Sequence, residues 1–213
     1  MFSADLAATP LFLNMEADHS PTPADECALD YALMLRVGEG DHAAFRQLVE
    51  RHQNAVIGTV AKMLGNASES EDIAQQVFLR IWRHAKRYRP DAKFTTYLFT
   101  ITRNLVFNET RRKSRKKEVS SDERAENSNL AVEANPDRQP DAEILQAELQ
   151  QKVDEAISGL PEAQRMAVVL RRYEQLSYEE IAKVLDLSVS AVKSLLFRAR
   201  TSLREALRDY LDD

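Results

Sequence analysis

Residues 177–207 read SYEEIAKVLDLSVSAVKSLLFRARTSLREAL, and the architecture of the C-terminal part of the chain follows from them. Ser177 is followed three residues later by a glutamate, which is a capping box and predicts a helix over residues 178–185. A short polar turn then leads into a second helix that begins at Val189. Two helices joined by a turn of about three residues have the spacing of a helix-turn-helix.

The second of these helices has two distinct faces. Residues at the spacing of one helix face are apolar and are expected to pack on the rest of the domain: Val192, Leu195, Leu196, Ala199 and Leu203. The other face is basic and hydroxyl-rich. It carries Ser190, Lys193, Ser194, Phe197, Arg198 and Thr201, with Arg200 beside it.

Such a polar face suits the major groove of duplex DNA. Lysine and arginine neutralise phosphates or donate to guanine edges, and hydroxyls bond to either. Phe197 fits the same interpretation, because an aromatic ring contacts the methyl group of thymine in the groove, whereas exposure of the ring to water is unfavourable. The alternative is a structural helix pair whose basic face is only solvated.

The composition predicts an all-α protein. The 213 residues include only 5 glycines and 7 prolines, too few for many short strands and turns. We expect two small helical domains joined by a flexible acidic linker. The expected boundaries are an acidic N-terminal extension over 1–29, a first domain over 30–117, a linker over 118–140 and a second domain over 141–213.

The charges are segregated along the chain, although the net charge of -5 does not by itself indicate a nucleic-acid binder. Bases dominate residues 103–117, acids dominate residues 118–143, and bases dominate again over residues 193–208. This order suggests two phosphate-facing modules on a solvated tether. Ordinary solvated helix faces would give the same pattern.

Three helices are predicted in the first domain. The first covers residues 43–64 and ends at Gly65. Ser68 and Glu71 form a capping box that is expected to open the second. The third begins near Phe94 and continues into the basic run.

This third helix interleaves aromatic side chains with threonines, Arg103 and Asn104. Aromatic rings beside bases and hydroxyls fit single-stranded DNA, whose exposed bases stack on them. The alternative is that the aromatic residues belong to the core. Phe94 supports that alternative because it shares a helical stripe with three aliphatic residues.

Other functional classes find little support. One cysteine, Cys27, excludes an intramolecular disulfide. No basic leader, membrane-length apolar run, metal-ligand spacing or catalytic motif is present, so we expect a cytoplasmic non-enzyme without metal or cofactor. The four histidines are expected to be solvated.

Two long stretches resemble one family. SEDIAQQVFLRIWRHAKRYRPDAKFTTYLFTITRNLVFNETRRK at 70–113, with Ala44 and Phe45 before it, resembles sigma-factor region 2. LPEAQRMAVVLRRYEQLSYEEIAKVLDLSVSAVKSLLFRARTSLREAL at 160–207 resembles sigma-factor region 4. The linker is too short for the intermediate domain of primary sigma factors, so the resemblance is to the extracytoplasmic-function group.

The resemblance implies three sets of binding residues. Contact with the clamp helices of the largest polymerase subunit is implied for Glu71, Asp72, Gln75, Gln76 and Phe78. Capture of an unpaired base and its strand at the -10 element is implied for Tyr88, Arg89, Asp91, Lys93, Thr95, Thr96, Tyr97, Thr100, Arg103, Asn104, Arg111 and Arg112. Reading of the -35 element is implied for Ser190, Lys193, Ser194, Phe197, Arg198 and Arg200.

The function implied is that of an alternative sigma factor, which does no chemistry. Its implied partners are core RNA polymerase (clamp helices and flap), promoter DNA and an anti-sigma protein. Leu195 departs from the family pattern, where a basic residue is common, and the N-terminal extension has no counterpart in it. A stand-alone helix-turn-helix regulator is the alternative, although no dimer seam is evident.

Overall fold

The computed structural model describes residues 23–119 and 140–208, and every regular element within them is helical. The helices are α1 (Pro23–Gly38), α2 (His42–Leu64), α3 (Ala67–His84), the short 3-10 helix η1 (Ala85–Arg87), α4 (Phe94–Val119), α5 (Pro140–Ser158), α6 (Glu162–Arg172), α7 (Tyr178–Leu185) and α8 (Val189–Ala206). The predicted all-α class is therefore confirmed.

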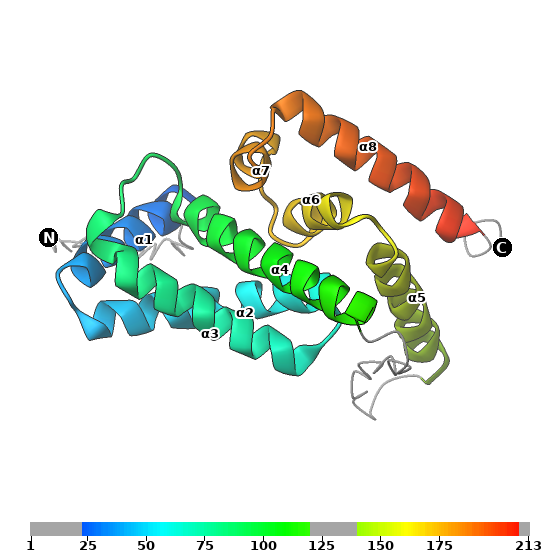
Figure 1. Ribbon diagram of the computed structural model, residues 1–213, viewed down its shortest axis with the longest axis horizontal. Coiled ribbons are helices and arrows are strands. Elements are labelled where there is room, and N and C mark those ends of the chain that lie inside the picture. The colour runs from blue at the N-terminus through cyan, green and yellow to red at the C-terminus, as the bar shows by residue number, and fades with distance from the viewer. Residues whose placement is uncertain (1–22, 120–139, 209–213) are drawn as a thin grey trace, which may run out of the picture.

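The helices form two groups in space (Figure 1). Helices α1 to α4 make one bundle, and α5 to α8 make a second group that packs against it through α6 on α2 and α7 on α4. Most of the acidic linker and of the N-terminal extension lies outside the described residues, and residues 23–29 of that extension are helical. Within the described ranges, no helix has the length and apolar character needed to span a bilayer.

Capping residues determine where α2 begins and ends and where α3 begins. Asp41 begins α2 by accepting hydrogen bonds from the backbone N–H groups of Ala43 at 2.8 Å and Ala44 at 3.1 Å. Gly65 ends α2 in the left-handed conformation at φ 69°, as predicted. The predicted capping box at Ser68 is wrong, because α3 begins earlier, with Asn66 as its cap.

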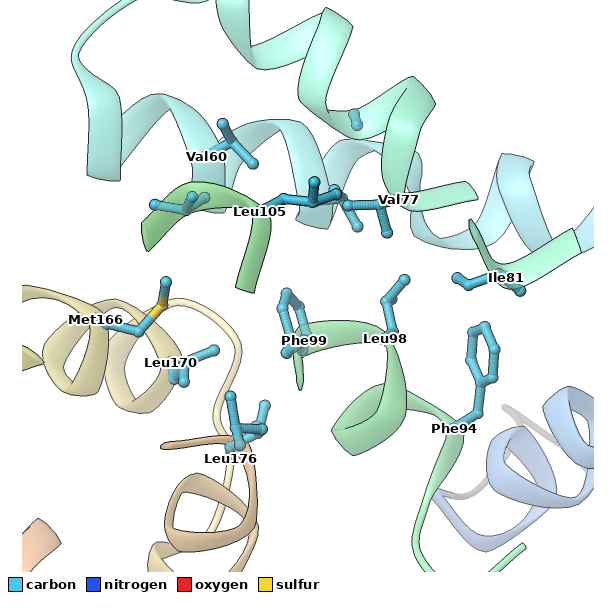
Figure 2. Packing of buried hydrophobic residues seen from close by; sticks show 14 of the residues in the cluster. Val60, Val77, Ile81, Phe94, Leu98, Phe99, Leu105, Met166, Leu170 and Leu176 are labelled. Atoms are coloured by element: carbon cyan, nitrogen blue, oxygen red, sulfur yellow. The ribbon is translucent and has the colours of Figure 1, made fainter. Parts of the chain in front are cut away.

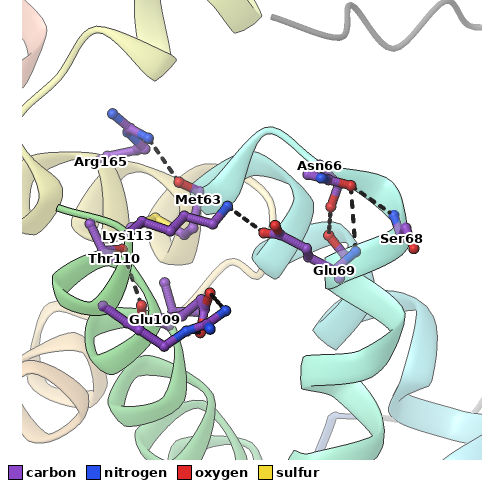
Figure 3. A network of polar contacts seen from close by, with 11 residues as sticks. Met63, Asn66, Ser68, Glu69, Glu109, Thr110, Lys113 and Arg165 are labelled. Atoms are coloured by element: carbon purple, nitrogen blue, oxygen red, sulfur yellow. Dashed lines mark hydrogen bonds and ion pairs between the residues drawn. The ribbon is translucent and has the colours of Figure 1, made fainter. Parts of the chain in front are cut away.

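Asn66 takes the cap position because its side-chain oxygen accepts from the N–H groups of Ser68 at 3.1 Å and Glu69 at 3.4 Å (Figure 3). Asparagine and serine are comparable N-cap residues, so side-chain preference does not separate the two positions. Gly65, in the left-handed conformation, turns the chain immediately before Asn66, which places Asn66 and not Ser68 at the start of α3. Ser68 consequently lies in the first turn of α3.

The core of the bundle lies between α2, α3 and α4 (Figure 2). Val60, Val77, Ile81 and Leu98 are fully buried there. Phe94, on the same stripe of α4, is buried as well. This stripe of aliphatic and aromatic residues therefore belongs to the core, which is the alternative interpretation given above for this helix. The half-buried aromatic residues Tyr97 and Phe107 flank that stripe.

A buried carboxylate joins α1 to α2. Asp30 is only 4% exposed and accepts from Arg51 Nε at 2.9 Å, while His52 Nε2 lies 2.9 Å from its other oxygen. The expectation that all histidines are solvated is therefore wrong for His52. The reason is that α1 extends back to Pro23 and covers this part of α2.

The helix-turn-helix forms as predicted. Ser177 Oγ accepts from the N–H of Glu180 at 3.2 Å, and the Glu180 carboxylate accepts from the N–H of Ser177 at 2.7 Å. Asp186 ends α7 in the left-handed conformation, and Ser188 caps α8 by accepting from Ala191 N–H at 3.2 Å. The predicted apolar stripe of α8 faces the core, with Val192 and Ala199 buried and Leu195, Leu196 and Leu203 partly buried.

Replacing Ser177 with alanine should destabilise the C-terminal group by about 1 kcal/mol, because one N–H of the first turn of α7 then loses its acceptor. Chemical denaturation followed by circular dichroism measures the change. Ser114→Ala, at an exposed position of α4, is the matched control and should leave the midpoint unchanged. Equal midpoints for both variants would contradict the role of the capping box.

Candidate nucleic-acid interface

The outer face of α8 presents the predicted -35 residues to solvent. Ser190, Lys193, Ser194, Arg198 and Arg200 are all exposed. Phe197 projects furthest, with 70% of its surface exposed. No carboxylate within residues 23–119 or 140–208 forms an ion pair with any of the three cations, so their donors are available to an anionic ligand.

The hydroxyl groups of this face are already oriented by the helix. Ser194 Oγ donates to the carbonyl oxygen of Ser190 at 3.0 Å, and Thr201 Oγ1 donates to that of Phe197 at 3.2 Å. These bonds use the hydroxyl protons and leave the oxygen lone pairs as acceptors. The face therefore combines free cationic donors, hydroxyl acceptors and one aromatic ring, which is the set required for groove readout.

The predicted -10 residues lie on the loop before α4 and along α4, at three levels of burial. The exposed members are Arg89, Asp91, Lys93, Asn104, Arg111 and Arg112, and the partly buried members are Tyr88, Thr95, Tyr97, Thr100 and Arg103. Thr96 is buried in the core and does not reach the surface. Two residues are about 200° apart on an α-helix, so Thr96 lies on the side of α4 away from Phe94 and Leu98, and its burial there keeps it from direct contact with a strand in this arrangement.

An aromatic cluster anchors the loop that precedes α4. The ring of Tyr88 lies 5.2 Å from that of Tyr97 and 6.4 Å from that of Phe94, and the His52 ring lies 5.1 Å from Phe94. Partial burial raises the pKa of both tyrosines above its ordinary value. The hydroxyl groups are therefore neutral donors at physiological pH, on a loop whose start is held by ring packing.

The basic end of α4 is partly neutralised by acidic neighbours (Figure 3). Arg112 donates to both oxygens of Glu109, at 2.9 and 2.6 Å, and this bidentate contact lowers the pKa of the Glu109 carboxyl. Lys113 pairs with Glu69 of α3. Arg111, by contrast, is exposed and has no ion-pair partner among the described residues, so it is the freest cation of the predicted set at this end.

The predicted polymerase-binding residues share the exposed face of α3, with one exception. Glu71, Asp72, Gln75 and Gln76 are exposed. Phe78 is only 6% exposed and packs in the bundle core, so it supports this face from beneath.

Sequence reasoning missed Leu79 on the same helix, which is 49% exposed. Leu79 follows Gln75 and Gln76 at the i+4 and i+3 spacing, so it belongs to their face. That spacing is the signal that would have found it. An apolar side chain beside amides and a carboxylate is typical of the centre of a protein contact surface.

Comparison with known proteins assigns both groups of helices to one family. The family described as Sigma-70 region 2 matches residues 48–116, and Sigma-70, region 4 matches residues 150–203. RNA polymerase sigma-H factor of Pseudomonas aeruginosa is 35% identical over 185 residues, which is 85% of this chain and 95% of that protein. The chain belongs to the sigma-70 family.

Other similar proteins place this sigma-70 chain in the extracytoplasmic-function group. ECF RNA polymerase sigma-E factor of Escherichia coli (strain K12) is 35% identical over 176 residues, 82% of this chain and 92% of that one. The structure of CnrH in complex with the cytosolic domain of CnrY has a TM-score of 0.62 at 26% identity and covers 85% of this chain and 98% of that chain.

A further structure shares the fold. That of the sigma factor RpoE in complex with the anti-sigma factor NepR from Bartonella quintana has a TM-score of 0.63 at 23% identity, over 77% of this chain and 96% of that chain. In this sigma-70 protein, most of α2, all of α3 and most of α4 lie in the region 2 match, and the last part of α5 through most of α8 lies in the region 4 match.

Proposed function

We propose that this protein is an alternative sigma factor that binds core RNA polymerase and directs initiation at promoters with -35 and -10 elements. The observation that carries the proposal is the outer face of α8, where Phe197 is 70% exposed beside three cations free of carboxylate partners among the described residues. Exposure of that ring to water does not stabilise the helix, whereas in a major groove the ring contacts a thymine methyl group.

In this proposal, the domain boundaries are those expected from the sequence. Residues 30–117 form region 2, residues 118–140 the linker, residues 141–213 region 4, and residues 1–29 an extension. Helix α8 reads the -35 element with Ser190, Lys193, Ser194, Phe197, Arg198 and Arg200. Family membership and the exposure of this face support the assignment.

Region 2 would hold the separated strand at the -10 element. The loop over residues 88–93, anchored by the Tyr88 ring, would take up an unpaired base, and Arg103, Asn104 and Arg111 of α4 would follow the strand. Unstacking a base costs a few kcal/mol, and binding of that base on the protein offsets the cost. The protein itself would contribute binding energy and no covalent chemistry.

The exposed face of α3 would dock on the clamp helices of the largest polymerase subunit. Asp72, Gln75 and Gln76 supply polar contacts, and Leu79 supplies the apolar centre. The flap of the polymerase is the proposed contact of region 4. An anti-sigma protein is a further proposed partner, supported by the extracytoplasmic-function group and by CnrH, 26% identical, which binds the cytosolic domain of CnrY.

Run-off transcription tests the proposal. Purified core polymerase is incubated with a genomic fragment library, with and without the full chain. Discrete new transcripts, whose start sites define the promoter elements, are the expected result. If the same core responds to another sigma factor but gives no new transcript with this chain, the protein is a stand-alone DNA-binding regulator instead.

Asp72→Lys should weaken binding to core polymerase by roughly 10-fold or more, because reversal of a charge inside a complementary interface replaces attraction with repulsion. Fluorescence anisotropy of the labelled chain titrated with core polymerase measures this. Glu50→Lys makes the same change in charge at an exposed position of α2 and is the control. Equal weakening by both variants would mean that α3 has no special role.

A further inference from the structure

The loop over residues 88–93, proposed above to take up an unpaired base, rests on a row of packed aromatic rings. The Tyr88 ring at the start of the loop lies 6.4 Å from the ring of Phe94, the first residue of α4. Phe94 is buried, and its ring lies 5.1 Å from that of His52 on α2. The His52 ring therefore supports, through Phe94, the two points at which the loop begins and ends.

A carboxylate on a different helix fixes the position of the His52 ring. Asp30 of α1 is 4% exposed, and its Oδ2 lies 2.9 Å from His52 Nε2. Its other oxygen, Oδ1, accepts from Arg51 Nε at 2.9 Å. A buried carboxylate is costly unless its oxygens are paired, so movement of either partner would leave a buried charge unsatisfied. The contact thus sets the direction in which the edge of the His52 ring points.

Asp30 also lies near the loop itself. Helix α1 packs on η1, which immediately precedes the loop, and on α4 (Figure 1). Burial raises the pKa of the Tyr88 hydroxyl, and the negative charge of Asp30 is the next cause of that rise. Charges act in this way mainly on close neighbours. The buried carboxylate and the first residue of the loop are therefore neighbours in space, although they are far apart in the sequence.

We propose that Asp30 is a positioning residue for recognition of the unpaired base at the -10 element. It holds the His52 ring, the ring supports Phe94, and Phe94 keeps the two ends of the loop at the spacing that the base requires. This inference rests on the function proposed above and gives α1 a role in it. Asp30 lies before residue 48, where the match to region 2 begins, and it belongs to none of the three sets of binding residues implied by the resemblance.

A carboxylate that only joined α1 to α2 would stabilise the fold without acting on the loop. The two roles use different partners of Asp30. His52 belongs to the row of rings under the loop, whereas Arg51 has no ring with which to join that packing. Loss of the contact with Arg51 should therefore affect stability alone, and loss of the contact with His52 should also affect the loop.

Two variants interrupt the proposed connection on its two sides. Asp30→Ala removes the carboxylate, and His52→Phe keeps a ring against Phe94 but loses the nitrogen that faces Asp30. Each should weaken binding of the -10 strand by roughly 10-fold, which is the effect of losing one stacked base. The double variant should bind no more weakly than either single variant, because both changes act through one contact. Arg51→Gln is the control, and it should lower the midpoint of unfolding without changing the affinity for the strand.

Fluorescence anisotropy of a labelled single strand, titrated with the complex of core polymerase and the full chain, measures the affinity. The probe is the non-template strand of a -10 element mapped by run-off transcription. A second probe carries another base at the position whose substitution most weakens binding of the unchanged chain. In Asp30→Ala and His52→Phe the ratio of the two affinities should fall toward one, because a displaced loop no longer fits one base. A smaller population of folded molecules lowers both affinities alike, so the ratio separates positioning from stability.

Three results would overturn the inference and leave the sigma-factor function untouched. The first is a base preference in both single variants that equals that of the unchanged chain. The second is an additive loss of affinity in the double variant, and the third is a loss of preference in Arg51→Gln as large as that in Asp30→Ala. Absence of any transcript with saturating core polymerase and the unchanged chain would instead count against the proposed function itself.

Discussion

Leu98→Ala will lower the free energy of unfolding by about 3 kcal/mol. Leu98 is 0% exposed and lies at the centre of the bundle between α3 and α4, beside Val77 and Ile81 (Figure 2). Truncation removes buried methyl groups and leaves a cavity, and buried leucine-to-alanine changes cost about 2–5 kcal/mol. Because α4 also carries the proposed -10 face, the same change loosens the support of that face.

Urea denaturation monitored by circular dichroism measures this loss. Leu35→Ala makes the same chemical change on α1 where the side chain is 50% exposed, so its effect should stay below about 1 kcal/mol. A loss below about 1 kcal/mol for Leu98→Ala would mean that the α3–α4 core is loosely packed. Equal losses for the two variants would contradict the burial of Leu98.

The parts of the structure that depend on local chemistry could be predicted from the sequence. The capping box at Ser177, the end of α2 at Gly65 and the bounds of α7 each follow from residues within one helical turn. The two faces of α8 follow from the 3.6-residue period, and the structure confirms that its apolar residues face the core and its basic residues face solvent. The DNA-binding role of those basic residues stays a prediction.

The parts that depend on neighbours distant in sequence could not be predicted. His52 was expected in solvent because nothing near it shows that Asp30 lies against it. Thr96 and Phe78 were assigned to binding faces by likeness to the family, while the burial of each is decided by the helices that pack on it. The contact of Lys93 with Glu180 joins residues of different domains, and no local pattern indicates it.

The largest functional effect is expected on α8. Replacing Lys193 and Arg198 together with alanine should weaken binding of the complex with core polymerase to a duplex promoter by roughly 100-fold. Both side chains are exposed and have no carboxylate partner among the described residues, so the loss of two DNA contacts of about 1–3 kcal/mol each accounts for this magnitude. Arg46→Ala, at an exposed base of α2 outside all the predicted sets, is the control and should change the affinity little.

The single variants separate the roles of the two cations through the salt dependence of binding. A lysine that contacts a phosphate contributes to every sequence alike, so Lys193→Ala should reduce the slope of log affinity against log salt by about 1 and weaken cognate and altered promoters equally. An arginine that reads a guanine contributes at one position only, so Arg198→Ala should weaken the cognate promoter and relax discrimination there. Uniform effects from both variants would mean that α8 positions the protein on the duplex, and sequence readout would then fall to Phe197 and the hydroxyl groups around it.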